Sequence, residues 1–146
     1  MNIIDQLRRD YPTYNYQPAD DAHWSYQKKT IYYTDDAVKT LHELGHALAD
    51  HSHYHLDAEL LTIERQAWQI AQKLAPHYSL TIDDETIESA LDSYREWLHI
   101  RSKCPTCQLN GVQSAETLYY QCPNCLTIWQ ANTAKNNRLK RHIIKK

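Results

Sequence analysis

The pattern of apolar and polar positions predicts three long helices. Apolar residues recur three and four positions apart over about residues 35–50, 56–75 and 83–100, which is the spacing of one helix face. Hydroxyl and acidic residues stand just before the first and third of these stretches, where they can cap a helix start. A shorter pattern of the same kind predicts a helix near residues 1–9.

A β-hairpin is predicted ahead of the first long helix. The segments His23–Tyr26 and Thr30–Thr34 are rich in aromatic and β-branched residues and flank the polar turn Gln27–Lys29. Strands of this length need another element to cover them. Together with the helices they predict an α+β fold.

The first long helix contains the sequence Leu41-His-Glu-Leu-Gly-His46. Residues four apart share a helix face, so His42 and His46 can offer two imidazoles to one zinc ion, with Glu43 beside the metal-bound water. In a zinc peptidase such a glutamate is the general base, and the metal polarises the scissile carbonyl. Gly45 costs about 1 kcal/mol in helix propensity relative to alanine, which predicts close backbone packing there. The hairpin would then bind an extended substrate backbone along its edge, or would be a purely structural hairpin that packs on a helix.

A catalytic zinc ion has three protein ligands and an open position. Outside the three-histidine class, a carboxylate from the next helix most often completes this pattern. Glu64 lies 18 residues past His46 among apolar residues of the second long helix, where an acid is costly unless it is paired or bound to metal. We therefore predict Glu64 as the third ligand, with Asp57 and Glu59 as alternatives.

Three more histidines, His51, His53 and His55, follow in a polar loop. A three-histidine peptidase would place its last ligand six residues beyond His46, where this chain has Ser52. We predict that the three are loop residues, the alternative being that one of them lines the active site or binds metal. The group that stabilises the oxyanion stays open among His53, Tyr54, His77 and Tyr78.

Composition predicts a cytoplasmic chain without membrane contact. Apolar residues make up 42% and charged residues 23%, as in globular proteins. No apolar run approaches the roughly 20 residues of a membrane span, and the charged N-terminus lacks a signal core.

The strongest pattern by spacing is a pair of Cys-Pro-x-Cys knuckles. Cys104, Cys107, Cys122 and Cys125 are all the cysteines of the chain, and 14 residues separate the two pairs. Four thiolates so spaced predict a structural zinc ion in a zinc ribbon, with a strand over Thr117–Gln121. Two disulfides are the alternative, which a cytoplasmic location disfavours.

Charge is divided unevenly along the chain. The net charge of -2 comprises about +7 in residues 101–146 and about -9 in residues 1–100. The basic part predicts contact with nucleic acid, with Tyr119, Tyr120 and Trp129 as stacking groups. The alternative is a solubilising tail, with the aromatic residues in the small core of the ribbon.

Residues 23–76 resemble the ImmA/IrrE-type metallopeptidase domain. The resemblance rests on the strand Thr30–Thr34, the Leu41–His46 motif, and Glu64-Arg-Gln-Ala67 followed by Ile70-Ala71 and Pro76. It implies His42, His46 and Glu64 as zinc ligands and Glu43 as catalytic base. The chain has Gln66 and Trp68 where the family often has Glu and Asn. Neither departure is expected to touch a proposed ligand.

The sequence thus predicts a zincin-like metallopeptidase domain over residues 1–100, a ribbon over 101–132 and a basic tail over 133–146. The expected function is zinc-dependent hydrolysis of a protein substrate, such as a repressor or another DNA-associated regulator. A SprT-like DNA-associated protease is one alternative, although it would be expected to use a third histidine. The other is a non-catalytic, DNA-binding or regulatory ribbon protein on a peptidase-like scaffold.

Overall fold

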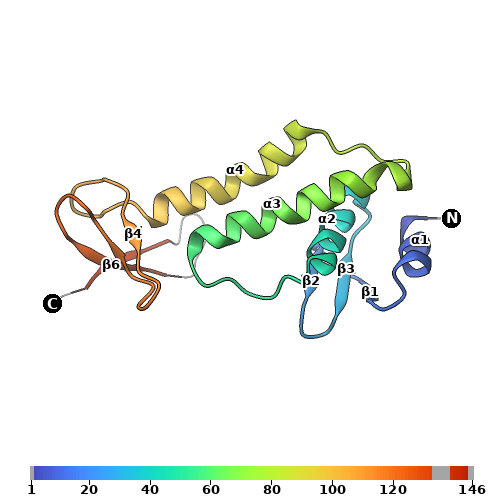
Figure 1. Cartoon of the computed structure of the whole chain (residues 1–146), viewed down its shortest axis with the longest axis horizontal. Helices are drawn as coiled ribbons and strands as arrows, with labels where there is room; N and C mark the ends of the chain where they lie inside the picture. The colour runs from blue at the N-terminus through green and yellow to red at the C-terminus, as the bar shows by residue number, and fades with distance from the viewer. Residues whose placement is uncertain (1, 133–138, 145–146) are drawn as a thin grey trace. The chain divides into compact units, whose positions relative to one another are not determined.

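The computed structural model describes residues 2–132 and 139–144. The described residues form an α+β fold with four α-helices and two small sheets (Figure 1). The helices are α1 (Ile3–Asp10), α2 (Ala37–Leu48), α3 (Asp57–Leu74) and α4 (Asp84–Arg101), with a 3-10 turn, η1, at Ala75–Tyr78. All four predicted helices are confirmed, with ends within about two residues of those expected.

The chain divides into two compact units, which we describe separately. One unit comprises the described residues of Met1–His53 and Thr62–Ser89. The other comprises the described residues of Tyr54–Leu61 and Ala90–Lys146. The helices α3 and α4 each contribute residues to both units.

The sheet of the first unit has three strands in the order β1-β3-β2. The predicted hairpin is present, because β2 (His23–Ser25) pairs antiparallel with β3 (Thr30–Tyr33). The strand β1 (Asn15–Pro18), which we did not predict, pairs parallel with β3. Only Tyr16 of its four residues is buried, so β1 carries no readable alternation. Its addition makes β3 the central strand and β2 an edge strand.

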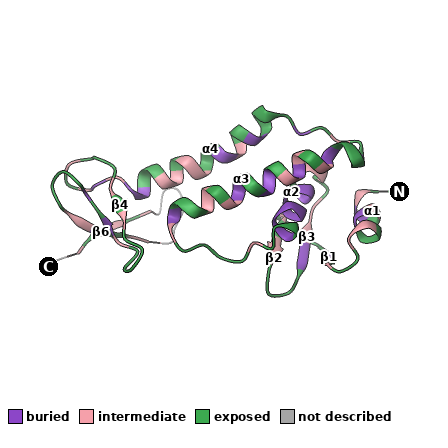
Figure 2. Ribbon diagram, viewed as in Figure 1, coloured by how far each residue is buried: buried purple, intermediate pink, exposed green. Residues whose placement is uncertain are grey.

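Helix α2 is buried along most of its length (Figure 2). It packs on β2 and β3, and the Asp36 side chain caps its start by accepting from Lys39 N at 3.1 Å. A Cβ atom added at Gly45 would lie 2.2 Å from the carbonyl oxygen of Ala67 on α3. The close packing predicted from Gly45 is therefore present, and it brings the backbones of α2 and α3 together.

The sheet of the second unit is antiparallel, in the order β4-β5-β6-β7. The strands are β4 (Val112–Gln113), β5 (Tyr120–Gln121), β6 (Ile128–Ala131) and β7 (Arg141–Ile143). The strand predicted over Thr117–Gln121 is shorter than expected, because Leu118 has a φ of 66° and closes a turn. Strand β7 comes from the segment predicted as a basic tail.

A buried polar cluster joins this sheet to helix ends within the second unit. Asp57 Oδ2 accepts from Arg101 Nε at 3.0 Å and from the Tyr120 hydroxyl at 2.6 Å. Gln113 Oε1 accepts from the Asp57 backbone N–H at 2.7 Å, and Trp129 Nε1 donates to the Arg101 carbonyl at 3.0 Å. These bonds compensate for the burial of the two charges.

Among the described residues, no helix combines the length and the apolar character that crossing a membrane requires.

Candidate metal centre

Helices α2 and α3 bring three metal-ligating side chains of the first unit to one point. His42 and His46 lie one turn apart on α2, and Glu64 faces them from α3. The distance from Glu64 Oε2 is 2.9 Å to His42 Nε2 and 3.3 Å to His46 Nε2. The two Nε2 atoms are 3.2 Å apart. The structure thus assembles the three residues that the sequence predicts as ligands, and they could hold a metal ion.

These distances fit tetrahedral coordination. Ligand atoms about 2.1 Å from a tetrahedral ion lie about 3.4 Å from one another, close to the three separations found. All three side chains are buried, with at most 9% of each residue exposed. Two imidazoles and one carboxylate are a donor set that zinc ions accept in proteins.

The electrostatics favour an ionised Glu64. Burial alone would raise the pKa of this carboxyl, but hydrogen bonds with His42 and His46 outweigh it and lower the pKa to about 2. On His42 burial acts in the other direction, because it disfavours the charged imidazolium and so lowers the pKa. A buried carboxylate beside a neutral imidazole is the protonation state in which both groups can coordinate a cation.

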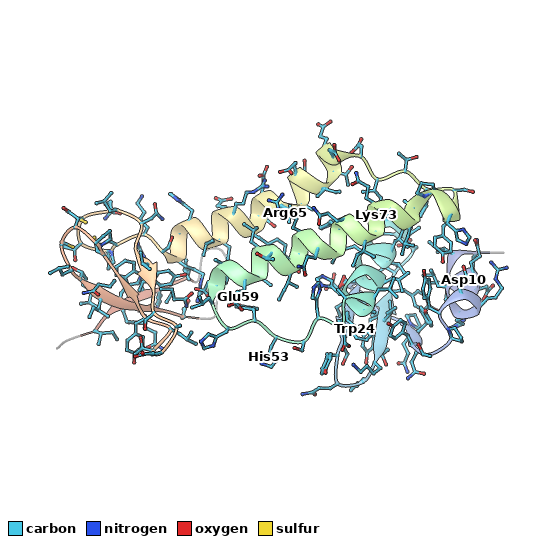
Figure 3. All side chains as sticks on the ribbon, viewed as in Figure 1. Asp10, Trp24, His53, Glu59, Arg65 and Lys73 are labelled. Atoms are coloured by element: carbon cyan, nitrogen blue, oxygen red, sulfur yellow. The ribbon has the colours of Figure 1, made fainter. Side chains whose placement is uncertain are left out.

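Glu43 lies beside these ligands with a different protonation preference. Its Oε2 is 4.0 Å from His42 Nε2, and burial raises the pKa of the carboxyl to about 7. A hydrogen bond with the backbone of Trp24 opposes that rise. Trp24 belongs to the edge strand β2, which packs against α2 (Figure 3). A carboxyl with a pKa near neutrality is suited to exchanging protons at physiological pH.

Trp68 touches a candidate ligand, contrary to our expectation. Its ring stacks on the His42 imidazole with a centroid distance of 4.2 Å and an interplanar angle of 19°. His42 Nδ1 is buried and has no hydrogen-bond partner among the residues that the structure describes. The His42 ring is therefore held by its Nε2 contact with Glu64 and by stacking on Trp68, both on α3. Sequence reasoning missed this role because a tryptophan on the buried face of a helix is usually a core residue.

His51 lies closer to the centre than a solvated loop residue would. Its Nδ1 is 3.0 Å from His46 Nδ1, and its Nε2 is 2.9 Å from Gln66 Oε1. The other loop histidines differ from it. His53 is exposed, and His55 contacts the Ala115 carbonyl in the second unit.

Asp57 and Glu59, the alternatives to Glu64 as the third metal ligand, are bonded to other groups. Asp57 pairs with Arg101, and the Glu59 carboxylate accepts from the His55 backbone N–H at 3.0 Å. Two candidates for oxyanion stabilisation are also engaged away from the histidines, because Asp10 accepts from the Tyr78 hydroxyl at 2.9 Å and lies 3.5 Å from His77 Nε2.

The four cysteines form a second cluster that could hold a metal ion. The Sγ atoms of Cys104 and Cys125 are 3.6 Å apart, and those of Cys107 and Cys122 are 3.3 Å apart. These are separations of free thiols, whereas sulfur atoms in a disulfide lie about 2.05 Å apart. Burial would raise the pKa of Cys104, but backbone N–H bonds to its sulfur outweigh that effect and lower it to about 6. Such a lowered pKa favours the thiolate that a metal ion requires.

The basic region presents fewer groups to solvent than its composition suggests. Arg101 is buried against Asp57, and Tyr120 and Trp129 are stacked in the small core of the second unit at a centroid distance of 5.6 Å. For these two aromatic residues the alternative interpretation, a place in the core, holds. Four basic residues of the predicted tail, Lys135, Arg138, Lys145 and Lys146, lie outside the described residues.

Comparison of the chain with protein-family models, curated proteins and solved structures gives no match.

Proposed function

We propose that this chain is a zinc-dependent endopeptidase with a zincin-like, ImmA/IrrE-type catalytic unit. The observation that carries the proposal is the convergence of His42 Nε2, His46 Nε2 and Glu64 Oε2 beside the buried carboxyl of Glu43. A scaffold that only binds a partner has no need of a buried glutamate next to two histidines and an acid. Burying such a group without a compensating role is costly.

The roles of the residues follow from their positions. His42, His46 and Glu64 would hold the zinc ion, which would lower the pKa of a water molecule to about 7 and polarise the scissile carbonyl. Glu43 would accept at its carboxylate the proton that the attacking water loses, and would later deliver it to the leaving amine. Burial raises the pKa of the Glu43 carboxyl, which makes its carboxylate a better proton acceptor than that of an exposed glutamate.

The substrate would bind as an extended segment along β2. This strand is an edge of its sheet, and the backbone of Trp24 on it already bonds with Glu43. A peptide added to that edge would be held by backbone hydrogen bonds with its scissile bond near the base. The substrate class we propose is a protein, such as a repressor or other DNA-associated regulator.

The cysteine cluster would hold a structural zinc ion. Four protein sulfurs leave no open coordination position, so the ion would stabilise the ribbon rather than catalyse. We further propose that residues 101–146 recruit substrate or nucleic acid, with Lys103 and Lys140 among the described cations and Lys135, Arg138, Lys145 and Lys146 outside the described residues.

Metal analysis tests the first step of this proposal. Zinc-loaded protein should contain about two ions per chain, His42→Ala should contain one, and Glu64→Ala should bind the second ion much more weakly. Glu59→Gln is the matched control, because this exposed acid also lies on α3 but binds the His55 backbone. A single ion that is insensitive to His42→Ala would end the peptidase proposal and favour the regulatory-scaffold alternative.

Glu43→Gln tests catalysis itself. The amide keeps the size of the side chain but cannot accept the proton, so both ions should remain and cleavage should stop. The measurement is the set of new protein N-termini in cells that express the wild type, Glu43→Gln or Glu59→Gln. New N-termini that are equally abundant with Glu43→Gln would show that this chain does not produce them.

A truncation tests recruitment. If residues 101–146 contact nucleic acid, removing them should abolish DNA binding that weakens with salt. DNA binding that survives the truncation would place the contact elsewhere in the chain. Cleavage of the protein substrate only when the full chain is bound to DNA would favour the SprT-like alternative.

A further inference from the structure

The end of α2 forms a turn that places His51 directly against His46. Asp50 N–H donates to the Ala47 carbonyl at 3.0 Å, and His51 N–H donates to the His46 carbonyl at 3.0 Å. Asp50 has a left-handed φ of 56°. These bonds and this φ define a Schellman motif, in which the residue after the left-handed position meets the third residue from the helix end. Those two residues here are His51 and His46.

Two contacts hold His51 in this position. Trp24 Nε1 donates to the His51 carbonyl at 2.9 Å, which ties the turn to β2. Gln66 Oε1 lies 2.9 Å from His51 Nε2, which ties its ring to α3. His51 is thus anchored at its backbone and at its side chain, and both anchors belong to the elements around the candidate metal centre.

The hydrogen bonds define one consistent set of proton positions. If His46 Nε2 coordinates a metal ion, that atom carries no proton, so His46 Nδ1 is protonated and donates to His51 Nδ1. His51 Nδ1 must then be an acceptor, which puts the His51 proton on Nε2. That proton faces Gln66 Oε1, an amide oxygen that accepts it. The ring N–H donors of His46 and His51 thus each meet an acceptor.

We propose that His51 and Gln66 are positioning residues of the metal site, which fix the orientation and tautomer of His46 and strengthen its bond to zinc. This inference rests on the proposed zinc site. Histidine ligands of metals usually donate their second ring N–H to such a partner, and losing the partner typically lowers metal affinity 10- to 100-fold. Glu64 supplies a negative charge and His42 a second imidazole ligand for the metal ion. His51 sets the direction in which the lone pair of His46 Nε2 points.

The test compares zinc affinities of full-length variants by chelator competition. His51→Phe keeps a ring and removes both nitrogens, and zinc affinity at the His42–His46–Glu64 site should fall 10- to 100-fold. His51→Asn puts an amide oxygen near the position of Nδ1 and should restore most of the affinity. His53→Phe changes an exposed histidine of the same loop and should have no effect. The circular dichroism of the metal-free variants should match that of the wild type.

Gln66 provides a second readout that a purely structural role would not give. Gln66→Ala should weaken zinc binding and Gln66→Glu should strengthen it, because a carboxylate accepts the His51 proton more strongly than an amide does. Both effects should vanish in the His51→Phe background, because the coupling passes through the His51 ring.

The possible failures are distinguishable. If wild-type protein binds zinc only at the cysteines, the proposed function and this inference both fail. If it binds two ions and His51→Phe retains wild-type affinity, or if His53→Phe weakens binding as much as His51→Phe does, only the inference about His51 is overturned.

Discussion

Replacing Gly45 by alanine should damage the fold and the metal site together. The new Cβ would lie 2.2 Å from the Ala67 carbonyl oxygen, whereas carbon and oxygen atoms in ordinary contact are about 3.3 Å apart. The helices must therefore separate by about 1 Å. The obstructing atom belongs to the α3 backbone, so no flexible side chain can move aside.

The two energetic effects of this substitution have opposite signs. Alanine gains about 1 kcal/mol of helix propensity over glycine. Overpacking a close-packed interior typically costs about 1–3 kcal/mol, and backbone contact puts Gly45 at or above the upper end. We therefore expect the free energy of unfolding to fall by about 2 kcal/mol. Propensity alone would predict an increase.

The same displacement should disturb the ligands. Glu64 lies one helical turn before Ala67 on α3, and its Oε2 is now 2.9 Å from His42 Nε2. Metal–ligand distances tolerate only about ±0.2 Å, so a shift of about 1 Å in α3 should lower zinc affinity at least tenfold.

Urea denaturation and chelator competition measure the two effects. Lys39→Ala is the matched control, because it introduces alanine at an exposed position of α2 and should change neither quantity appreciably. If Gly45→Ala were as stable as wild type or more stable, with unchanged zinc affinity, the inferred clash between α2 and α3 would be refuted.

Four further predictions concern single substitutions. Asp57→Ala leaves the buried Arg101 without its carboxylate and should lower the free energy of unfolding in urea by about 3–5 kcal/mol. Tyr120→Phe removes one hydrogen bond to the same carboxylate and should lower the free energy of unfolding by less, about 1.5–3 kcal/mol. A larger loss for Tyr120→Phe than for Asp57→Ala would contradict the pairing of Asp57 with Arg101. Cys122→Ser should leave one metal ion per chain in elemental analysis, and retention of two would exclude the cysteine site. Asp36→Ala removes the side chain that caps α2 and should lower the free energy of unfolding by about 1 kcal/mol. Asp36→Asn keeps a capping oxygen and should lower it much less.

The helices and the candidate ligands could be predicted because their signals are local. Four-residue spacing places His42 and His46 on one face of any helix, independently of its surroundings. Glu64 could be inferred because an acid among apolar residues needs a partner, and two histidines on the preceding helix were the partners available. Gly45 gave a local signal as well, because a glycine inside a helix usually marks a close approach.

Long-range contacts were less predictable. The pairing of β1 with β3 joins residues 15 positions apart in parallel, and a four-residue strand with one buried position has no periodicity to reveal it. The stacking of Trp68 on His42 depends on how α3 is rotated against α2. The burial of Trp129 depends on strands that close around it. In each case the partner is chosen by packing between elements rather than by a neighbour in sequence.

His51 shows where sequence reasoning could have gone further. Coordination motifs place a third histidine ligand six residues past His46, at position 52, so the spacing of metal ligands directs attention to Ser52 and not to His51. A partner of a ligand obeys a different rule. When a helix ends at a left-handed residue, the backbone brings together positions five apart across the end, and aspartate tolerates that conformation better than most residues. The sequence His46-Ala-Leu-Ala-Asp50-His51 contains that geometry, so a histidine five residues past a ligand histidine at a helix end is a signal for a partner that orients the ligand.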